Sequence, residues 1–366
     1  MVQTYNGKIA LKGCNCGKLQ GLIATAKTPY FTYMKHVSIL VLKEAIMSSI
    51  DAPRQLFSKV NEILLARGRE PVFQVNLVGS TKEVAISDGS YIIQCDQTIA
   101  EASLTDLIIV PMICNGFPKA IEVNRELIPW VVRQYKNNAE IACLCVGSFF
   151  VAATGLLDGK NCAVHWAAAA EFKEMYPGVT VVNDKLITHQ QGIYTSGGNY
   201  SYLNLLLCLV EKYAGRGMAI YFSKMFQIDM ERKSQAPYTI FSGQKTHEDE
   251  PVKRAQEYIE NNYQDKITVE SLCLLFSVSR RNFERRFKKA TANTIIAYAQ
   301  RVKMEVVKKG LETTTRPIVD LMYDVGYTDT KAFRTIFRKL TGLSPQAYRN
   351  KYAPQLVAEY SAFATF

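Results

Sequence analysis

Two side chains of this 366-residue chain, Cys145 and His165, have types and positions that could do covalent chemistry. Cys145 lies at the end of an apolar run, 141–146, that predicts a buried strand turning sharply at a glycine into a helix over 149–156. Such a turn presents a thiol at the edge of a sheet near a helix N-terminus, which lowers the thiol pKa. His165 follows a short strand over 161–164 and could be its base. Three roles stay open for this pair: packing or relic residues of a pocket, ligand-contacting or redox-responsive groups, or a nucleophile with its base.

Basic side chains gather in the last third of the chain, where they could contact a polyanion. Residues 251–366 hold 20 Lys and Arg against 11 Asp and Glu, a net charge of +9 out of the +11 of the whole chain. Lys and Arg release condensed counterions when they bind phosphates, so double-stranded DNA is the natural partner of this region. The alternative is that the basic runs are only solvated faces.

A helix-turn-helix pattern occurs twice in this basic region, the second copy about fifty residues after the first. Each copy, 269–287 and 318–337, has an apolar helical stripe, a short turn, and a second helix with only two aromatic positions for burial. These buried positions are Phe283 and Phe287 in the first copy and Phe333 and Phe337 in the second. An internal repeat of this fidelity favours DNA binding over a solvated face.

The outward positions of the two second helices are the candidates for DNA contacts. Those near the helix start are expected to face base edges in the major groove: Arg280, Arg281, Glu284 and Arg285, then Thr330, Lys331, Arg334 and Thr335. Those further along are expected to contact phosphates, which position a protein without reading sequence: Lys288, Lys289, Arg338 and Lys339.

Cap and turn residues predict where these helices begin and end. Ser279 and Asp329 stand where an N-cap would satisfy the first free amides of each second helix. Gly326 can take the backbone angles of a tight turn between helices. Pro317 would break any helix continuing from 295–311, so a long linker helix is predicted to join the two modules.

Residues 252–352 resemble the AraC/XylS class of bacterial transcription factors. The most specific match is Val325-Gly326-Tyr327, then the two aromatic positions of the second copy, then the closing run Thr341-Gly342-Leu343-Ser344-Pro345-Gln346-Ala347-Tyr348-Arg349. The resemblance implies two helix-turn-helix units on a linker helix, in a regulator that binds a specific DNA sequence.

The preceding region alternates short apolar runs with amphipathic helices, which predicts an α/β sandwich with a mostly parallel, flavodoxin-like sheet. Strands are expected near 37–42, 73–78 and 107–110, helices over 53–67 and 120–135, and a hairpin turn at 87–90.

Residues 37–230 resemble the PfpI-like branch of the class I glutamine-amidotransferase fold, in particular the version fused ahead of AraC-type domains. The match rests on Cys145-Val146-Gly147, on 152–160, on His165-Trp166, and on Thr195-Ser196-Gly197-Gly198. Two positions depart from the family: Ser49 stands for its acidic residue, and Met112-Ile113 for its Gly-Gly oxyanion turn. The resemblance therefore implies an inactive, amidotransferase-like sensor of a small nitrogen-containing metabolite, with pocket candidates Ser49, Met112, Cys145, Val146 and His165.

Five segments are expected along the chain: a poorly ordered extension (1–33), the sensor domain (34–231), a flexible linker (232–250), the DNA-binding domain (251–352) and a tail (353–366). Nine irregularly spaced cysteines favour reduced thiols. No secretory signal or membrane span is recognisable, which favours the cytoplasm. Cys14-Asn15-Cys16 has no partner pair nearby, so neither a metal nor another cofactor is predicted.

The sequence thus predicts a cytoplasmic transcription regulator, not an enzyme, that binds operator DNA and a small-molecule effector and forms a homodimer. Two alternatives stay open. One is a Cys-dependent amidase, hydratase or peptidase with an accessory DNA-binding domain. The other is an architectural DNA binder that is indifferent to sequence.

Overall fold

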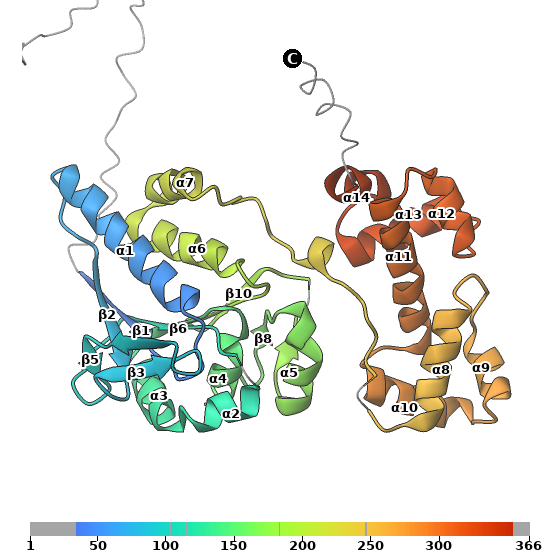
Figure 1. Ribbon diagram of the computed structural model, residues 1–366, viewed down its shortest axis with the longest axis horizontal. Helices are drawn as coiled ribbons and strands as arrows, with labels where there is room; N and C mark the ends of the chain where they lie inside the picture. The colour runs from blue at the N-terminus through green and yellow to red at the C-terminus, as the bar shows by residue number, and fades with distance from the viewer. Residues whose placement is uncertain (1–33, 103, 115, 183, 246, 354–366) are drawn as a thin grey trace, which may run out of the picture. The chain divides into compact units, whose positions relative to one another are not determined.

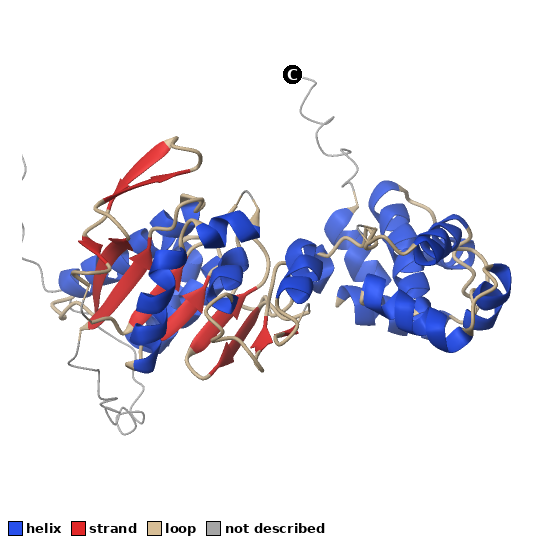
Figure 2. Ribbon diagram, turned by 90° about the horizontal axis from the view of Figure 1, so that it is seen from below, coloured by secondary structure: helices blue, strands red, loops and turns tan. Residues whose placement is uncertain are grey.

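The computed structural model describes residues 34–102, 104–114, 116–182, 184–245 and 247–353. The predicted N-terminal extension, the Cys14-Asn15-Cys16 motif and the tail after residue 353 lie outside these ranges. The described residues form an α/β part followed by an all-helical part, which confirms the predicted fold class (Figure 1). Figure 2 shows the strands confined to the α/β part.

A seven-stranded sheet in the order β10-β11-β7-β6-β1-β2-β5 forms the centre of the α/β part. Every neighbouring pair is parallel except β10 with β11. In chain order the strands are β1 (Lys35–Leu40), β2 (Phe73–Gly79), β5 (Gln97–Thr98), β6 (Leu107–Val110), β7 (Glu140–Cys143), β10 (Ile187–Gln190) and β11 (Ile193–Ser196). Two small sheets pair β3 (Glu83–Ile86) with β4 (Tyr91–Gln94) and β8 (Asn161–Cys162) with β9 (Thr180–Val181).

Helices cover both faces of the sheet, which explains why its central strands are continuously apolar. All four residues of β6 are buried, as expected for a parallel strand with a helical layer on each side. In Figure 1, α1 (Ser48–Ala66), α6 (Tyr202–Ala214) and α7 (Arg216–Met225) lie on one side of the strands. On the other side lie α2 (Phe117–Glu122), α3 (Ile128–Lys136) and α4 (Ser148–Ala152), while α5 (Ala169–Met175) follows β8.

The segment 120–135, expected as a single helix, is broken into α2, a short 3-10 turn (Arg125–Leu127) and α3. Pro129 stands in the first turn of α3 and cannot donate a backbone hydrogen bond to a preceding helical turn. At this break the Asn124 carboxamide accepts from the Lys43 N–H and donates to the Lys43 and Ala120 carbonyls. The predicted hairpin turn at 87–90 is confirmed between β3 and β4.

The helical part has two separate apolar cores, one for each copy of the sequence repeat. Its helices are α8 (Glu250–Asn261), α9 (Val269–Leu275), α10 (Arg280–Thr291), α11 (Ile295–Thr313), α12 (Ile318–Asp324), α13 (Thr330–Thr341) and α14 (Pro345–Tyr352). Helix α11 is the predicted linker helix. Tyr298 and Val302 on α11 belong to the first core, while Met304, Val307 and Leu311 belong to the second.

The repeat extends to individual hydrogen bonds. The Tyr298 hydroxyl donates to Glu260 in the first module, and the Tyr348 hydroxyl donates to Glu312 in the second, both at 2.6 Å. Burial and then the glutamate hydrogen bond raise the pKa of both tyrosines, so both phenols stay protonated near neutral pH. The two modules are therefore one structural unit used twice.

Candidate nucleic-acid interface and effector site

The second helix of the first module, α10, presents most of its surface to solvent. Phe283 and Phe287 are buried and fix one face of the helix against the core. All six predicted DNA-contact residues of this module are exposed: Arg280, Arg281, Glu284, Arg285, Lys288 and Lys289. The structure thus gathers these six residues on the outside of one helix.

Two of these residues are engaged in ion pairs within the module. The Arg280 guanidinium pairs with Glu270 of α9 and, at 3.4 Å, with Glu284 one helical turn later. Arg281 has no such partner among the described residues, and Arg285 donates only to the Asn282 side chain, at 3.0 Å. Arg281 and Arg285 are consequently the readily available guanidinium groups of α10.

Helix α13 of the second module repeats this arrangement with different side chains. Phe333 and Phe337 are buried, while Thr330, Lys331, Arg334, Thr335, Arg338 and Lys339 are exposed. The Thr335 hydroxyl donates to the backbone carbonyl of Lys331, so it has an intrahelical partner already. None of the cations of α13 forms an ion pair with a described residue.

The two helix starts differ in their caps. The Asp329 carboxylate accepts from the N–H groups of Lys331 and Ala332, as predicted. Ser279 is the N-cap residue of α10, as predicted, but its side chain makes no capping hydrogen bond. Since this end of α10 is exposed, water can satisfy its first amides. Gly326 has φ +74°, and a Cβ there would overlap the Gln264 carbonyl, so the predicted tight turn is confirmed.

Cys145 occupies a strained turn directly after β7, as the sequence predicted. Its φ is +51°, in the left-handed region that a non-glycine residue adopts at a cost of about 1–3 kcal/mol. The Ser196 hydroxyl of β11 accepts from the Cys145 N–H at 3.1 Å, and the Ser148 hydroxyl donates to the Cys145 carbonyl. These hydrogen bonds hold the turn against the end of the neighbouring strand.

The expectation that this turn lowers the thiol pKa is wrong. The Cys145 side chain is buried, and desolvation raises its pKa to about 12 against a smaller lowering by a hydrogen bond with the Val146 backbone. The free-energy cost of desolvating the thiolate is larger than the stabilisation that the N-terminus of one short helix gives it. Cys145 is therefore a protonated thiol at neutral pH.

Ser49 and Met112, two of the predicted pocket residues, are in direct contact. The Ser49 hydroxyl accepts from the Met112 N–H at 3.0 Å and donates to the Ile46 carbonyl at 2.6 Å. Both side chains are buried. This hydroxyl therefore engages the Met112 amide, which lies where the family has its oxyanion turn.

His165 does not act on Cys145 in this conformation. Its Nδ1 accepts from the Ala167 N–H at 3.1 Å, and partial burial lowers its pKa, so the ring is neutral near pH 7. No hydrogen bond joins His165 to Cys145 within the ranges that the structure describes. Val146, the last of the five pocket candidates, is partly buried beside the thiol turn.

Two residues at this site escaped the sequence predictions as site residues. Tyr202 at the start of α6 is buried, its hydroxyl donates to the Ser48 carbonyl, and it lies near Cys145. Ser196 supports the thiol turn as described above. The Ser196 position had a signal, since it lies in the Thr-Ser-Gly-Gly run. Tyr202 had none, because an apolar helix offers no way to tell which aromatic residue faces a pocket.

The comparisons with known proteins agree with these two arrangements. Residues 59–212 match the DJ-1/PfpI family, and residues 272–351 match a helix-turn-helix domain. The chain is thus similar to the DJ-1/PfpI family in its α/β part, called the DJ-1/PfpI-type domain below, and to a helix-turn-helix domain in its helical part.

Relatives named as transcriptional regulators or activators match between 30% and 86% of the chain. The HTH-type transcriptional regulator GbdR of Pseudomonas aeruginosa is 25% identical over 86% of this chain and 83% of its own length. The regulator ArgR of the same organism is 26% identical over 59% of this chain and 66% of its own length. The Bacillus subtilis transcriptional activator and DNA repair enzyme AdaA is 34% identical over 30% of this chain and 51% of its own length.

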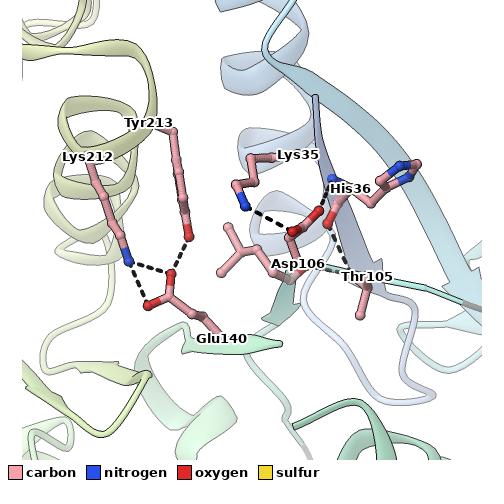
Figure 3. A network of polar contacts seen from close by, with 8 residues as sticks. Lys35, His36, Thr105, Asp106, Glu140, Lys212 and Tyr213 are labelled. Carbon is pink, nitrogen blue, oxygen red and sulfur yellow. Dashed lines mark hydrogen bonds and ion pairs between the residues drawn. The ribbon is translucent and has the colours of Figure 1, made fainter. Parts of the chain in front are cut away.

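A network of charged and polar side chains lies at the amino ends of the central strands of the DJ-1/PfpI-type domain (Figure 3). Glu140, the first residue of β7, accepts from Lys212 and from the Tyr213 hydroxyl of α6. Burial acts to raise the Glu140 pKa, but these hydrogen bonds prevail and lower it. A second pair joins Lys35 to Asp106 at 3.0 Å. These contacts join α6 to β7, and the start of β1 to the residue before β6.

A cavity of about 170 Å³ opens between the start of α1 and the β3–β4 hairpin of the DJ-1/PfpI-type domain. Its lining is Met47, Ile50, Asp51, Arg54, Leu77, Ile92, Ile93 and Gln94, so it includes none of the five predicted pocket residues.

No described helix is long and apolar enough to cross a bilayer. The described residues hold no cluster of His, Cys, Asp and Glu suited to a metal ion.

Proposed function

We propose that this chain is a sequence-specific DNA-binding transcription regulator whose DJ-1/PfpI-type domain binds a small metabolite. The observation that carries the proposal is the pair of second helices, α10 and α13. Each is held by two buried phenylalanines and exposes all six of its candidate contact residues, in a region with a net charge of +9. Relatives named as transcriptional regulators support the same function over most of the chain.

In this proposal α10 and α13 each enter a major groove. Arg281 and Arg285 are the leading base contacts of the first module, because they are exposed and form no ion pair with a described residue. Lys331 and Arg334 have the same role in the second module. The four later cations, Lys288, Lys289, Arg338 and Lys339, contact phosphates.

The joint position of both modules on α11 makes the expected DNA site bipartite. If both second helices dock together, they reach successive major-groove faces roughly 10 base pairs apart. A homodimer would double this footprint. We take residues 34–231 as the sensor and 251–352 as the reader.

The sensor is proposed to bind its effector without converting it. Three features argue against Cys145 as a nucleophile: its thiol is protonated, its proposed base His165 is bonded elsewhere, and Ser49 replaces the carboxylate. Nucleophilic catalysis needs an activated thiolate and a hydrogen-bonded base. A small nitrogen-containing metabolite, from the family resemblance, is the proposed effector.

The test is the affinity of the full-length protein for genomic DNA fragments and for random duplex, across a salt series. We expect a few fragments to bind at least ~10³-fold more tightly than random duplex. Log affinity should also fall linearly with log salt concentration. Uniform weak binding to all fragments would reject sequence-specific regulation and favour an architectural role.

A further inference from the structure

The segment 232–250, expected as a flexible linker, has a side chain buried in the DJ-1/PfpI-type domain. Gln235 is only 1% exposed, and its Nε2 donates to the Val164 carbonyl at 3.0 Å and to the Lys185 carbonyl at 3.3 Å. The neighbouring Ser234 hydroxyl donates to the Asp184 carbonyl at 2.6 Å. Glutamine is usually exposed, so its burial in a connecting segment indicates a specific binding site for this side chain. We call this site, formed around the Val164 and Lys185 carbonyls, the Gln235 seat.

This seat adjoins the predicted effector site from two sides. Val164, whose carbonyl accepts from Gln235, directly precedes His165. Gly197 lies against the Gln235 carboxamide, and a Cβ at position 197 would overlap that group. The residue before Gly197 is Ser196, which holds the thiol turn through the Cys145 N–H. One linker side chain therefore adjoins both the residue before His165 and the residue after Ser196, whose hydroxyl supports the Cys145 turn.

The Gln235 side chain also has an unsatisfied atom. Its Oε1 is buried and has no hydrogen-bond partner among the described residues. Buried acceptors without a partner are rare in native proteins, because each one loses the hydrogen bonds that water would supply. The seat is therefore sensitive to any N–H or O–H donor that approaches Gln235, and to any displacement of the Val164 carbonyl.

Beyond Gln235 the segment runs along α11 and contacts both helix-turn-helix modules. In the second module the Tyr352 hydroxyl donates to the Pro237 carbonyl, and Gly342 adjoins Pro237. In the second half of α11, the buried Lys308 ammonium donates to the Thr239 carbonyl at 2.6 Å.

The same segment then reaches the first module. The Phe241 N–H donates to Glu305, and the Phe241 ring packs edge-on against Tyr298. The buried Gln256 amide donates to the Gln244 carbonyl and to the Tyr298 hydroxyl. From Pro237 to Gln244 the segment thus connects the two modules along their shared helix.

We infer that Gln235 is a positioning residue that couples the effector site to the two reading modules. An effector carrying an N–H or O–H donor changes the Gln235 seat, directly at Oε1 or through the Val164 carbonyl. The change passes along residues 236–244 to α11, and α11 sets how α10 and α13 are presented. This inference rests on the proposed function, since it assumes that the modules read DNA.

Coupling between two sites is reciprocal, so DNA can serve as the probe while the effector is unidentified. The experiment measures hydrogen exchange of the full-length protein with and without the genomic fragment that binds most tightly. We expect DNA to change exchange in 161–168 and 193–198. The variant Gln235→Met, which keeps the side-chain length but loses the amide, should abolish that change while DNA affinity stays within a few fold. The matched control Gln74→Met, at an exposed position on β2, should behave as wild type.

Three outcomes of this experiment overturn the inference. An equal change in wild type and Gln235→Met would show that the signal takes another route. No change in wild type, with DNA bound, would show that there is no coupling. Failure of the wild type to prefer any fragment would reject the proposed function, and the inference with it, which is a distinguishable result.

A second measurement needs no DNA. Lys233 is exposed and lies two residues before the Gln235 seat, so trypsin cleavage after Lys233 reports how firmly the seat is held. We expect cleavage there to accelerate on the order of tenfold in Gln235→Met and in the shorter Gln235→Asn. Cleavage after Arg67, at the end of α1, is the internal control for folding and should not change. Equal rates at Lys233 in all three proteins would contradict the inference.

Discussion

Arg285→Ala should relax the choice of DNA sequence without affecting the fold. Arg285 is exposed on α10, and its only hydrogen bond to a described residue goes to the Asn282 side chain at 3.0 Å. Surface substitutions of this kind change stability by less than about 0.5 kcal/mol. A bidentate contact from Arg to guanine contributes about 1–3 kcal/mol of discrimination, which corresponds to about 5- to 150-fold between the right and the wrong base.

The assay is a binding titration of wild type and variant against the preferred fragment, its single-base variants and random duplex. Arg285→Ala should lose that factor on the preferred fragment and be nearly unchanged on random duplex. The matched variant Lys289→Ala, on the same helix, should weaken binding to every duplex alike and reduce the salt slope by about one. Equal losses for Arg285→Ala on preferred and random duplex would refute the assignment of α10 as a base-reading helix.

Three further predictions concern the fold and the thiol. Gly326→Ala should lower the free energy of unfolding by more than the cost of a strained φ alone, which is about 1–3 kcal/mol. The reason is that the added Cβ also meets a backbone carbonyl. The control in chemical denaturation is Gly68→Ala, where φ is also positive but the added Cβ has open space. Glu140→Gln should cost about 1.5–3 kcal/mol at neutral pH. Since the folded pKa of Glu140 is lowered, wild type holds this advantage above the unfolded pKa and loses it as pH falls through the folded pKa, which an acid titration of stability checks. Cys145 should react with iodoacetamide far more slowly than the exposed Cys208, and faster alkylation of Cys145 would revive an enzymatic role.

The sequence predicted the helical part well because its signals are local. A helical stripe, a break at Pro317 and a glycine at 326 each act within a few residues of where they stand. Phe283 and Phe287 are four residues apart, so they lie on the same helix face, and both are buried. This spacing is visible in the sequence itself. Because the helix-turn-helix pattern occurs twice, the same local signals are present in both modules.

The thiol site could not be predicted in the same way because its properties depend on residues distant in the chain. The pKa of Cys145 follows from burial among elements that the local strand-turn-helix pattern does not specify. Ser49 meets Met112 across 63 residues, and Tyr202 reaches the start of α1 across 154. The contacts of segment 232–250 also depend on residues distant in the chain. Gln235 lies in a polar stretch without periodicity, and only the fold brings it beside Val164 and Gly197.

The two modules differ where base contacts are expected and agree where phosphate contacts are expected. With the fifty-residue shift, Arg281 corresponds to Lys331 and Arg285 to Thr335, so the base-facing chemistry changes. The later positions keep their charge, since Lys288-Lys289 corresponds to Arg338-Lys339. Phosphates repeat uniformly along a duplex while bases do not, so a duplicated reader can retain its phosphate contacts and diverge in its base contacts. One chain should therefore recognise two different half-sites and bind its DNA in a single orientation.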